Sequence, residues 1–130
     1  MRIFFDGYPF LKNGNGGVAR YTLGLTQAIR RSGGDVAVSL CIPRGSKFPP
    51  ADEPYFEEGG LRAFCERRRA DIFHSFWYRM PASLHGARPV TTVYDWSDDA
   101  LPLYKINKSG FAAHQRKVIA ASAGLVAISE

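Results

Sequence analysis

Short apolar runs alternate along this chain with stretches whose apolar residues recur every three to four positions. Runs of this length are typical of buried strands, and the recurrence is typical of one face of a helix. Strands are expected at residues 2–6, 35–41, 71–75, 89–94 and 124–128. Helices are expected at residues 18–31, between Glu57-Glu58 and Arg67-Arg68-Arg69, and at residues 108–123. This alternation predicts an α/β fold, an open parallel sheet sandwiched by helices.

The spacing also predicts which side chains of each helix face the sheet. The inner face of the first helix is expected to carry Val18, Tyr21, Leu25, Ala28 and Ile29. The short helix is expected to bury Leu61, Phe64 and Cys65, and the last helix Phe111, Val118, Ile119 and Ser122. The glutamates and arginines that flank the short helix would match its dipole at both ends.

Ligands of such sheets bind beyond the carboxyl ends of the strands. Those ends are the loop at residues 6–17, the segment 74–78, and Tyr94-Asp95. We therefore expect the functional residues of this chain at these three places.

The composition narrows the function classes. The chain has 130 residues, enough for a single domain with its own core. Its net charge is +5, but the lysines and arginines are scattered, so no nucleic-acid partner is expected. No apolar run has the length of a membrane span, and the first residues lack a signal-peptide pattern. Cys41 and Cys65 lack metal-type spacing and are expected to be buried thiols of a cytoplasmic protein.

A glycine-rich segment, Gly14-Asn15-Gly16-Gly17-Val18-Ala19, fits the G-x-G-x-x-A pattern of dinucleotide-binding folds. In those folds the pattern directly follows the first strand, whereas here it starts well past Asp6. The acid expected after the second strand is missing, since Cys41-Ile42-Pro43 stands there. A nicotinamide or flavin cofactor is therefore disfavoured, and the sequence shows no metal-binding motif either.

Two interpretations of Gly16-Gly17 stay open. The pair is either a flexible turn that starts a helix, or a place where backbone amides approach an anion closely. Arg20 favours the second, because a cation in the first helical turn opposes the helix dipole unless an anion is bound there. The alternative for Arg20 is a solvated side chain.

The other strand ends carry candidates with equally open alternatives. His74 is either a hydrogen-bonded core residue or a ligand contact. Asp95 is either a loop cap or a functional carboxylate. The aromatic segment Phe76-Trp77-Tyr78 either covers the core or forms a rim that contacts a sugar or lipid, because aromatic rings stack on apolar faces.

Five segments in one order and at one spacing resemble the N-terminal domain of bacterial family-4 glycosyltransferases, the retaining group of the two-domain GT-B fold. They are Asp6, Gly16–Tyr21, Asp71–His74, Thr92–Asp95 and Ala127–Glu130. The resemblance spans the whole chain. It implies a Rossmann-like domain with strand order 2-1-3-4-5, which holds most of the acceptor site and reaches the phosphates of a nucleotide-sugar donor.

The resemblance assigns roles to individual residues. Gly16 and Gly17, with Arg20 beside them, would face the donor diphosphate. His74, Trp77 and Tyr78 would lie on the acceptor side. Asp95 would correspond to the aspartate of the family's His-Asp pair, while Tyr94 stands where histidine is usual.

The same resemblance implies that the donor-binding domain is absent from these 130 residues, which would then be inactive alone. The expected partners are a nucleotide sugar and a glycan or lipid-linked acceptor, and the last strand would form a self-associating edge. Lys105, Lys108, Arg116 and Lys117 suggest either peripheral membrane contact or a solvated helix face. The alternative function is a non-catalytic flavodoxin-like module that binds a phosphorylated ligand or a partner protein.

Overall fold

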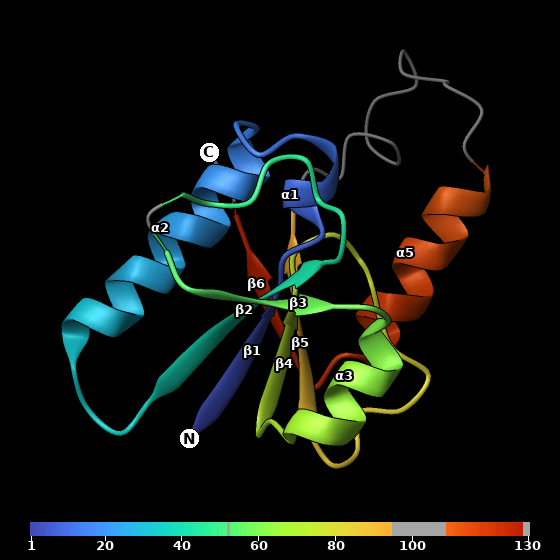
Figure 1. The fold of residues 1–130 in the computed structure, drawn as a ribbon. Helices are drawn as coiled ribbons and strands as arrows, with labels where there is room; N and C mark the ends of the chain where they lie inside the picture. The colour runs from blue at the N-terminus through green and yellow to red at the C-terminus, as the bar shows by residue number, and fades with distance from the viewer. Residues whose placement is uncertain (52, 95–108, 129–130) are drawn as a thin grey trace.

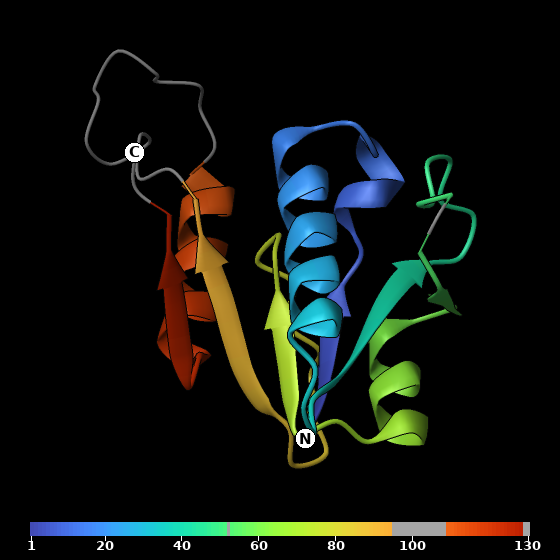
Figure 2. The same cartoon turned by 90° about the vertical axis from the view of Figure 1, so that its left-hand side faces the viewer.

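The computed structural model describes residues 1–51, 53–94 and 109–128, and within them the chain forms an open sheet of six parallel strands. The strands are β1 (Arg2–Asp6), β2 (Ala37–Pro43), β3 (Tyr55–Glu58), β4 (Ile72–Ser75), β5 (Arg88–Val93) and β6 (Gly124–Ala127). The helices are α1 (Pro9–Lys12), α2 (Gly17–Ser32), α3 (Leu61–Arg68) and α5 (Ser109–Ala121). Helix α2 covers one face, and α3 and α5 cover the other (Figures 1 and 2). The predicted fold class is confirmed.

The strand order is β3-β2-β1-β4-β5-β6. The five strands that the sequence predicts are β1, β2, β4, β5 and β6, and they lie side by side in the expected order, 2-1-3-4-5 when numbered among themselves. The strand β3 was not predicted, and it extends the sheet beyond β2. The strand β3 pairs with β2 in the register Cys41↔Phe56 and Ile42↔Glu57. The expectation that Glu57-Glu58 flank the short helix is therefore wrong, because both residues belong to β3 and the helix begins only at Leu61.

The segment that leads into β3 is attached to α2. The Arg30 guanidinium pairs with the Glu53 carboxylate and donates to the carbonyl oxygens of Val38 and Pro54. One side chain thus connects α2, β2 and the approach to β3. This connection helps to explain why a four-residue strand with two glutamates joins the sheet.

Successive side chains of β1 point to opposite faces and enter two separate core clusters. Ile3 and Phe5 pack on the α2 side, and Phe4 packs on the α3 side. The first cluster also contains Phe10, Ala19, Val38, Leu40, Ile42 and Phe76. The second contains Cys41, Leu61, Phe64, Cys65, Phe73 and Ala87. Both cysteines are buried and free, as expected.

Four of the five side chains predicted for the inner face of α2 pack against the first core cluster, namely Val18, Tyr21, Leu25 and Ile29. The most buried residues of the helix were not predicted. Ala19, Thr22 and Thr26 are the buried residues of this helix, whereas Ala28 is exposed. The threonines can be buried because each hydroxyl donates to the carbonyl oxygen one turn earlier, at 2.8 Å. With its polar atom paired inside the helix, a threonine presents mainly its methyl group to the sheet.

Helix α5 buries Gln115 and Val118, and Ser122 just beyond it bonds to Thr91 of β5 at 2.8 Å. Phe111 was expected inside but is 36% exposed, with its ring edge-on to Tyr78 at 6.0 Å between centroids. Within the described residues, no helix is long and apolar enough to cross a membrane.

The end of β1 approaches β2 so closely that residue 7 has no room for a side chain. The Gly7 N–H donates to the Cys41 carbonyl oxygen at 2.7 Å, and a Cβ on Gly7 would lie 2.6 Å from that oxygen. We predict that Gly7→Ala lowers the free energy of unfolding by about 1–3 kcal/mol, because backbone must move. Gly24→Ala, in α2 with nothing within 4 Å of its Cβ, should stabilise by about 0.5–1 kcal/mol. Urea denaturation measures both, and equal effects of the two substitutions would refute the packing argument.

The strand β6 is one edge of the described sheet, and it carries Leu125 with 53% exposure. Exposed apolar edge strands tend to pair with another chain. We predict that the chain self-associates with rising concentration and that Leu125→Lys reduces this association. Sedimentation velocity tests it, with Phe48→Lys as the control for an exposed apolar residue away from β6. A monomer at every concentration would contradict the prediction.

Candidate functional site

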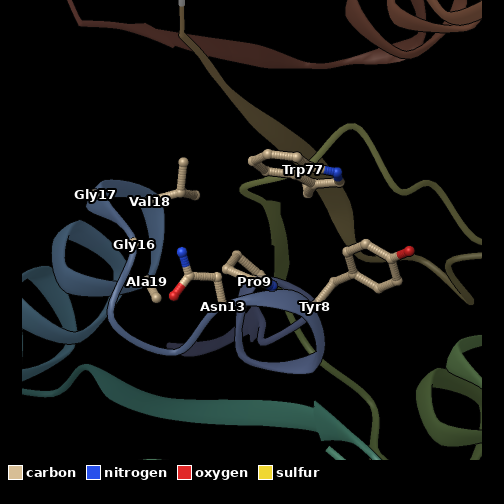
Figure 3. Close-up of a pocket in the computed structure, with 8 residues that line it drawn as sticks. All are labelled: Tyr8, Pro9, Asn13, Gly16, Gly17, Val18, Ala19 and Trp77. Carbon is tan, nitrogen blue, oxygen red and sulfur yellow. The ribbon is translucent and has the colours of Figure 1, made fainter. Parts of the chain in front are cut away.

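A pocket of about 180 Å³ lies beyond the carboxyl ends of β1 and β4 (Figure 3). Its lining residues are Tyr8, Pro9, Asn13, Gly16, Gly17, Val18, Ala19 and Trp77. They come from the loop after β1, the start of α2 and the loop after β4. The pocket therefore joins two of the three places where the sequence predicts functional residues.

The loop that leads into α2 is shaped by its own backbone and by Asn13. The Asn13 side-chain oxygen accepts from the Asn15 N–H at 3.2 Å, and the Asn13 carbonyl accepts from the Gly16 N–H at 3.1 Å. Gly16 is the N-cap of α2, and its carbonyl accepts the first bond of the helix, from the Arg20 N–H. Since glycine has no side chain to cap the helix, the N–H groups of the first turn remain for solvent or a ligand.

Gly16 and Gly17 differ in the space around them. A Cβ on Gly16 would lie 3.2 Å from the Asn13 side-chain nitrogen, a tight contact. A Cβ on Gly17 would have no described atom within 4 Å. Both glycines line the pocket, so a side chain on Gly17 would extend into open space at its wall without disturbing the packing.

Arg20 is exposed on α2 and is not one of the lining residues. The structure thus matches the alternative of a solvated side chain, and the phosphate role predicted for Arg20 stays a prediction.

A buried ion pair, which the sequence does not reveal, lies behind the pocket. The Asp6 side chain is fully buried, and its Oδ1 accepts from the Arg79 guanidinium at 2.8 Å and from the Tyr8 N–H at 3.1 Å. The guanidinium also lies over the Tyr8 ring, 4.9 Å from its centroid. The Arg79 N–H in turn donates to the Ser75 hydroxyl at 2.8 Å. The pair joins the end of β1 to the loop after β4, across 73 positions of sequence.

His74 is a core residue rather than part of the pocket wall. It is 6% exposed, its Nε2 lies 2.7 Å from the Thr92 hydroxyl, and its ring stacks on Phe76 at 4.3 Å. Burial lowers the pKa of His74 from 6.5 to about 4, so the side chain is neutral near pH 7. This placement matches the alternative of a hydrogen-bonded core histidine, and the acceptor role stays a prediction.

Trp77 and Tyr78 separate into two environments. Trp77 is 41% exposed and lines the pocket, and its contact with an acceptor stays a prediction. Tyr78 is buried, and its hydroxyl donates to the Tyr94 carbonyl at 3.1 Å. Its backbone has a left-handed φ of 55°, and its carbonyl accepts from His114 Nε2 at 2.8 Å. Tyr78 therefore ties the loop after β4 to β5 and α5 instead of facing the pocket.

Tyr94 follows β5, with its ring edge-on to Tyr21 at 6.0 Å. Burial raises the pKa of the Tyr94 hydroxyl, and the Tyr21 and Tyr78 hydroxyls raise it further. A neutral Tyr94 can donate a hydrogen bond but is a poor base at neutral pH. Asp95, predicted as the family aspartate, lies outside the described residues, as do Lys105 and Lys108.

The pocket combines two aromatic rings, one side-chain amide and a helix start without a side-chain cap, a set suited to binding a polar ligand that has apolar faces. Among the described residues, no group of three or more histidine, cysteine or acidic side chains could hold a metal ion. Sequence reasoning missed Tyr8, Asn13 and Arg79. The signal for Tyr8 was its position directly after the strand end, whereas nothing in the sequence pairs Arg79 with Asp6.

Searches against protein-family models, curated proteins and solved structures found no match for this chain. The family resemblance therefore rests on the sequence segments themselves.

The burial of His74 predicts a stability that depends on pH. The lowered pKa means that the unfolded chain binds a proton more readily than the folded one, so the stabilisation is complete above pH 6.5 and is lost between pH 6.5 and 4. We expect a loss on the order of 3 kcal/mol over this window. The His74→Gln variant keeps a hydrogen-bonding group but does not titrate, so its unfolding free energy should fall less steeply. Parallel pH curves for the two proteins would contradict the assignment.

Proposed function

We propose that this chain is the acceptor-side half of a retaining glycosyltransferase that moves a sugar from a nucleotide-sugar donor to a glycan or lipid-linked acceptor. One observation carries the proposal. The pocket brings Gly16 and Gly17 together with Trp77, although they follow different strands. The resemblance assigns the two glycines to the donor phosphates and Trp77 to the acceptor.

The donor side of the proposal is supported by the start of α2. Gly16 caps the helix without a side chain, and a Cβ on Gly17 would meet open space, so no side chain caps the first-turn amides beside the pocket. Uncovered amides at a helix N-terminus favour a negatively charged group. In sugar transfer such amides stabilise the diphosphate as it leaves.

The acceptor side is supported by the position of Trp77 across the pocket from the glycines (Figure 3). A sugar stacked on this ring would be held next to the donor phosphates, and such positioning is a large part of catalysis. The volume of about 180 Å³ is below the roughly 300–1,000 Å³ of pockets that enclose a whole ligand. This size agrees with a pocket that forms only one side of a larger cleft. In the proposal a donor-binding domain forms the other side, and the enzyme works on the cytoplasmic side of the membrane.

We predict that Gly17→Val lowers kcat/KM at least about tenfold in the longest natural gene product, assayed with a panel of nucleotide sugars. A tenfold loss corresponds to about 1.4 kcal/mol, close to one hydrogen bond lost by covering an amide. Gly24→Val in the same helix, also with open space around its Cβ, is the matched control and should leave kcat/KM unchanged.

The 130-residue chain is a further arm of the same assay and should transfer no sugar, because one wall of a cleft alone cannot orient the donor against the acceptor. Unchanged kinetics in Gly17→Val would count against the donor site. Binding of phosphorylated ligands without transfer by the long product would favour the non-catalytic module instead.

A further inference from the structure

Tyr8 is the second aromatic residue of the pocket wall, and it comes from a different strand end than Trp77. Its ring lies on the opposite side of the pocket from Gly16 and Gly17, as does the Trp77 ring (Figure 3). The Asn13 side chain lies between the rings and the glycines. Two rings thus lie across the pocket from the start of α2, with one amide side chain between them.

The position of Tyr8 is fixed from both its backbone and its ring. Its N–H donates to Asp6 Oδ1 at 3.1 Å, and its ring lies under the Arg79 guanidinium at 4.9 Å. The guanidinium is itself held by the same Oδ1 at 2.8 Å. Because Asp6 is fully buried at the end of β1, the ring is anchored to the rigid sheet rather than to a loop alone.

The segment after β4 supplies both Trp77 and the residue that holds Tyr8. Trp77 presents its ring to the pocket, and Arg79, two positions later, contacts Tyr8. The Arg79 N–H is bonded to the Ser75 hydroxyl at 2.8 Å, so this short segment is tied back to β4. The Asp6–Arg79 pair therefore holds the Tyr8 ring next to the segment that carries Trp77.

The two rings with the Asn13 side chain fit a sugar ring better than they fit phosphate or a lipid chain. A pyranose has faces of C–H groups that pack on aromatic rings, and hydroxyls around its rim that can bond to the Asn13 side chain. Phosphate would gain nothing from two aromatic rings, and a lipid chain would make no hydrogen bond to the Asn13 side-chain NH2 group, whose oxygen partner already accepts from the Asn15 N–H. The volume of about 180 Å³ suits one ring rather than an oligosaccharide.

We propose that Tyr8 and Trp77 form the binding wall for a single pyranose ring of the acceptor, with Tyr8 as a specificity-determining residue. Arg79, paired with Asp6, is a positioning residue that holds Tyr8. This inference rests on the proposed function, which it deepens by naming the acceptor group as a sugar.

The test measures the binding of simple sugars to the 130-residue chain by saturation-transfer NMR. The probes are the methyl pyranosides of glucose, mannose and galactose, with sorbitol as an acyclic control. Wild-type protein should bind at least one pyranoside in the millimolar range and should not bind sorbitol. Tyr8→Leu should weaken binding about three- to tenfold, the loss expected for one aromatic contact, and Tyr8→Phe should keep it. Phe48→Leu removes an exposed ring outside this pocket and should change nothing.

The positioning role of Arg79 has its own arm. Asp6→Asn combined with Arg79→Met removes the pair without leaving a buried charge, and it should weaken pyranoside binding as much as Tyr8→Leu. Arg79→Lys keeps a cation beside Asp6 and over the ring, so it should recover most of the affinity. Thermal unfolding of each variant confirms that the protein compared is folded.

Three outcomes overturn the inference. They are absence of pyranoside binding by the wild-type chain, binding that is equal for Tyr8→Leu and wild type, and full affinity in the folded double variant. Sugar transfer by the long gene product decides the proposed function separately. Transfer without pyranoside binding refutes the sugar wall alone, and pyranoside binding without transfer refutes the transferase proposal alone.

Discussion

A buried carboxylate at the end of β1 is the constraint around which this end of the molecule is arranged. Asp6 is fully buried, and a charge in that position is stable only when it is paired. Arg79 supplies the pair at 2.8 Å, and the Tyr8 N–H supplies a second bond to the same oxygen. These contacts bring the loop after β4 to the end of β1. The pocket exists because the two loops are held together there.

The sequence predicted the sheet well because its signals are local. Buried strands of a parallel sheet are short apolar runs, and glycines mark where helices begin and end, as at Gly17 and Gly33. The errors also have local causes. Threonine counts as polar in a hydrophobic pattern, yet Thr22 and Thr26 are the buried residues of α2, because their hydroxyls bond within the helix. The strand β3 was missed because half of it is glutamate, so it lacks the apolar run by which a buried strand is recognised.

The site was predicted less completely than the fold. The sequence placed Gly16, Gly17 and Trp77 correctly at strand ends, and the structure brings them into one pocket. The sequence also named His74 as a candidate at a strand end, but burial and the bond to Thr92 make His74 part of the core. Position after a strand indicates which end of the sheet a residue occupies, not which way its side chain points. For the same reason, the pairing of Arg79 with Asp6 could be found only in three dimensions.

Gly7 and Gly17 both lack a side chain, but for different physical reasons. At Gly7 a Cβ would lie 2.6 Å from the Cys41 carbonyl oxygen, so the close approach of β1 and β2 excludes any larger residue. At Gly17 no described atom lies within 4 Å of a Cβ, and the residue begins a regular helix, so packing does not require glycine there. The missing side chain at Gly17 leaves the wall of the pocket open at the start of the helix. The glycine that shapes the fold and the glycine that shapes the pocket are therefore different residues, and only the space around each one separates the two roles.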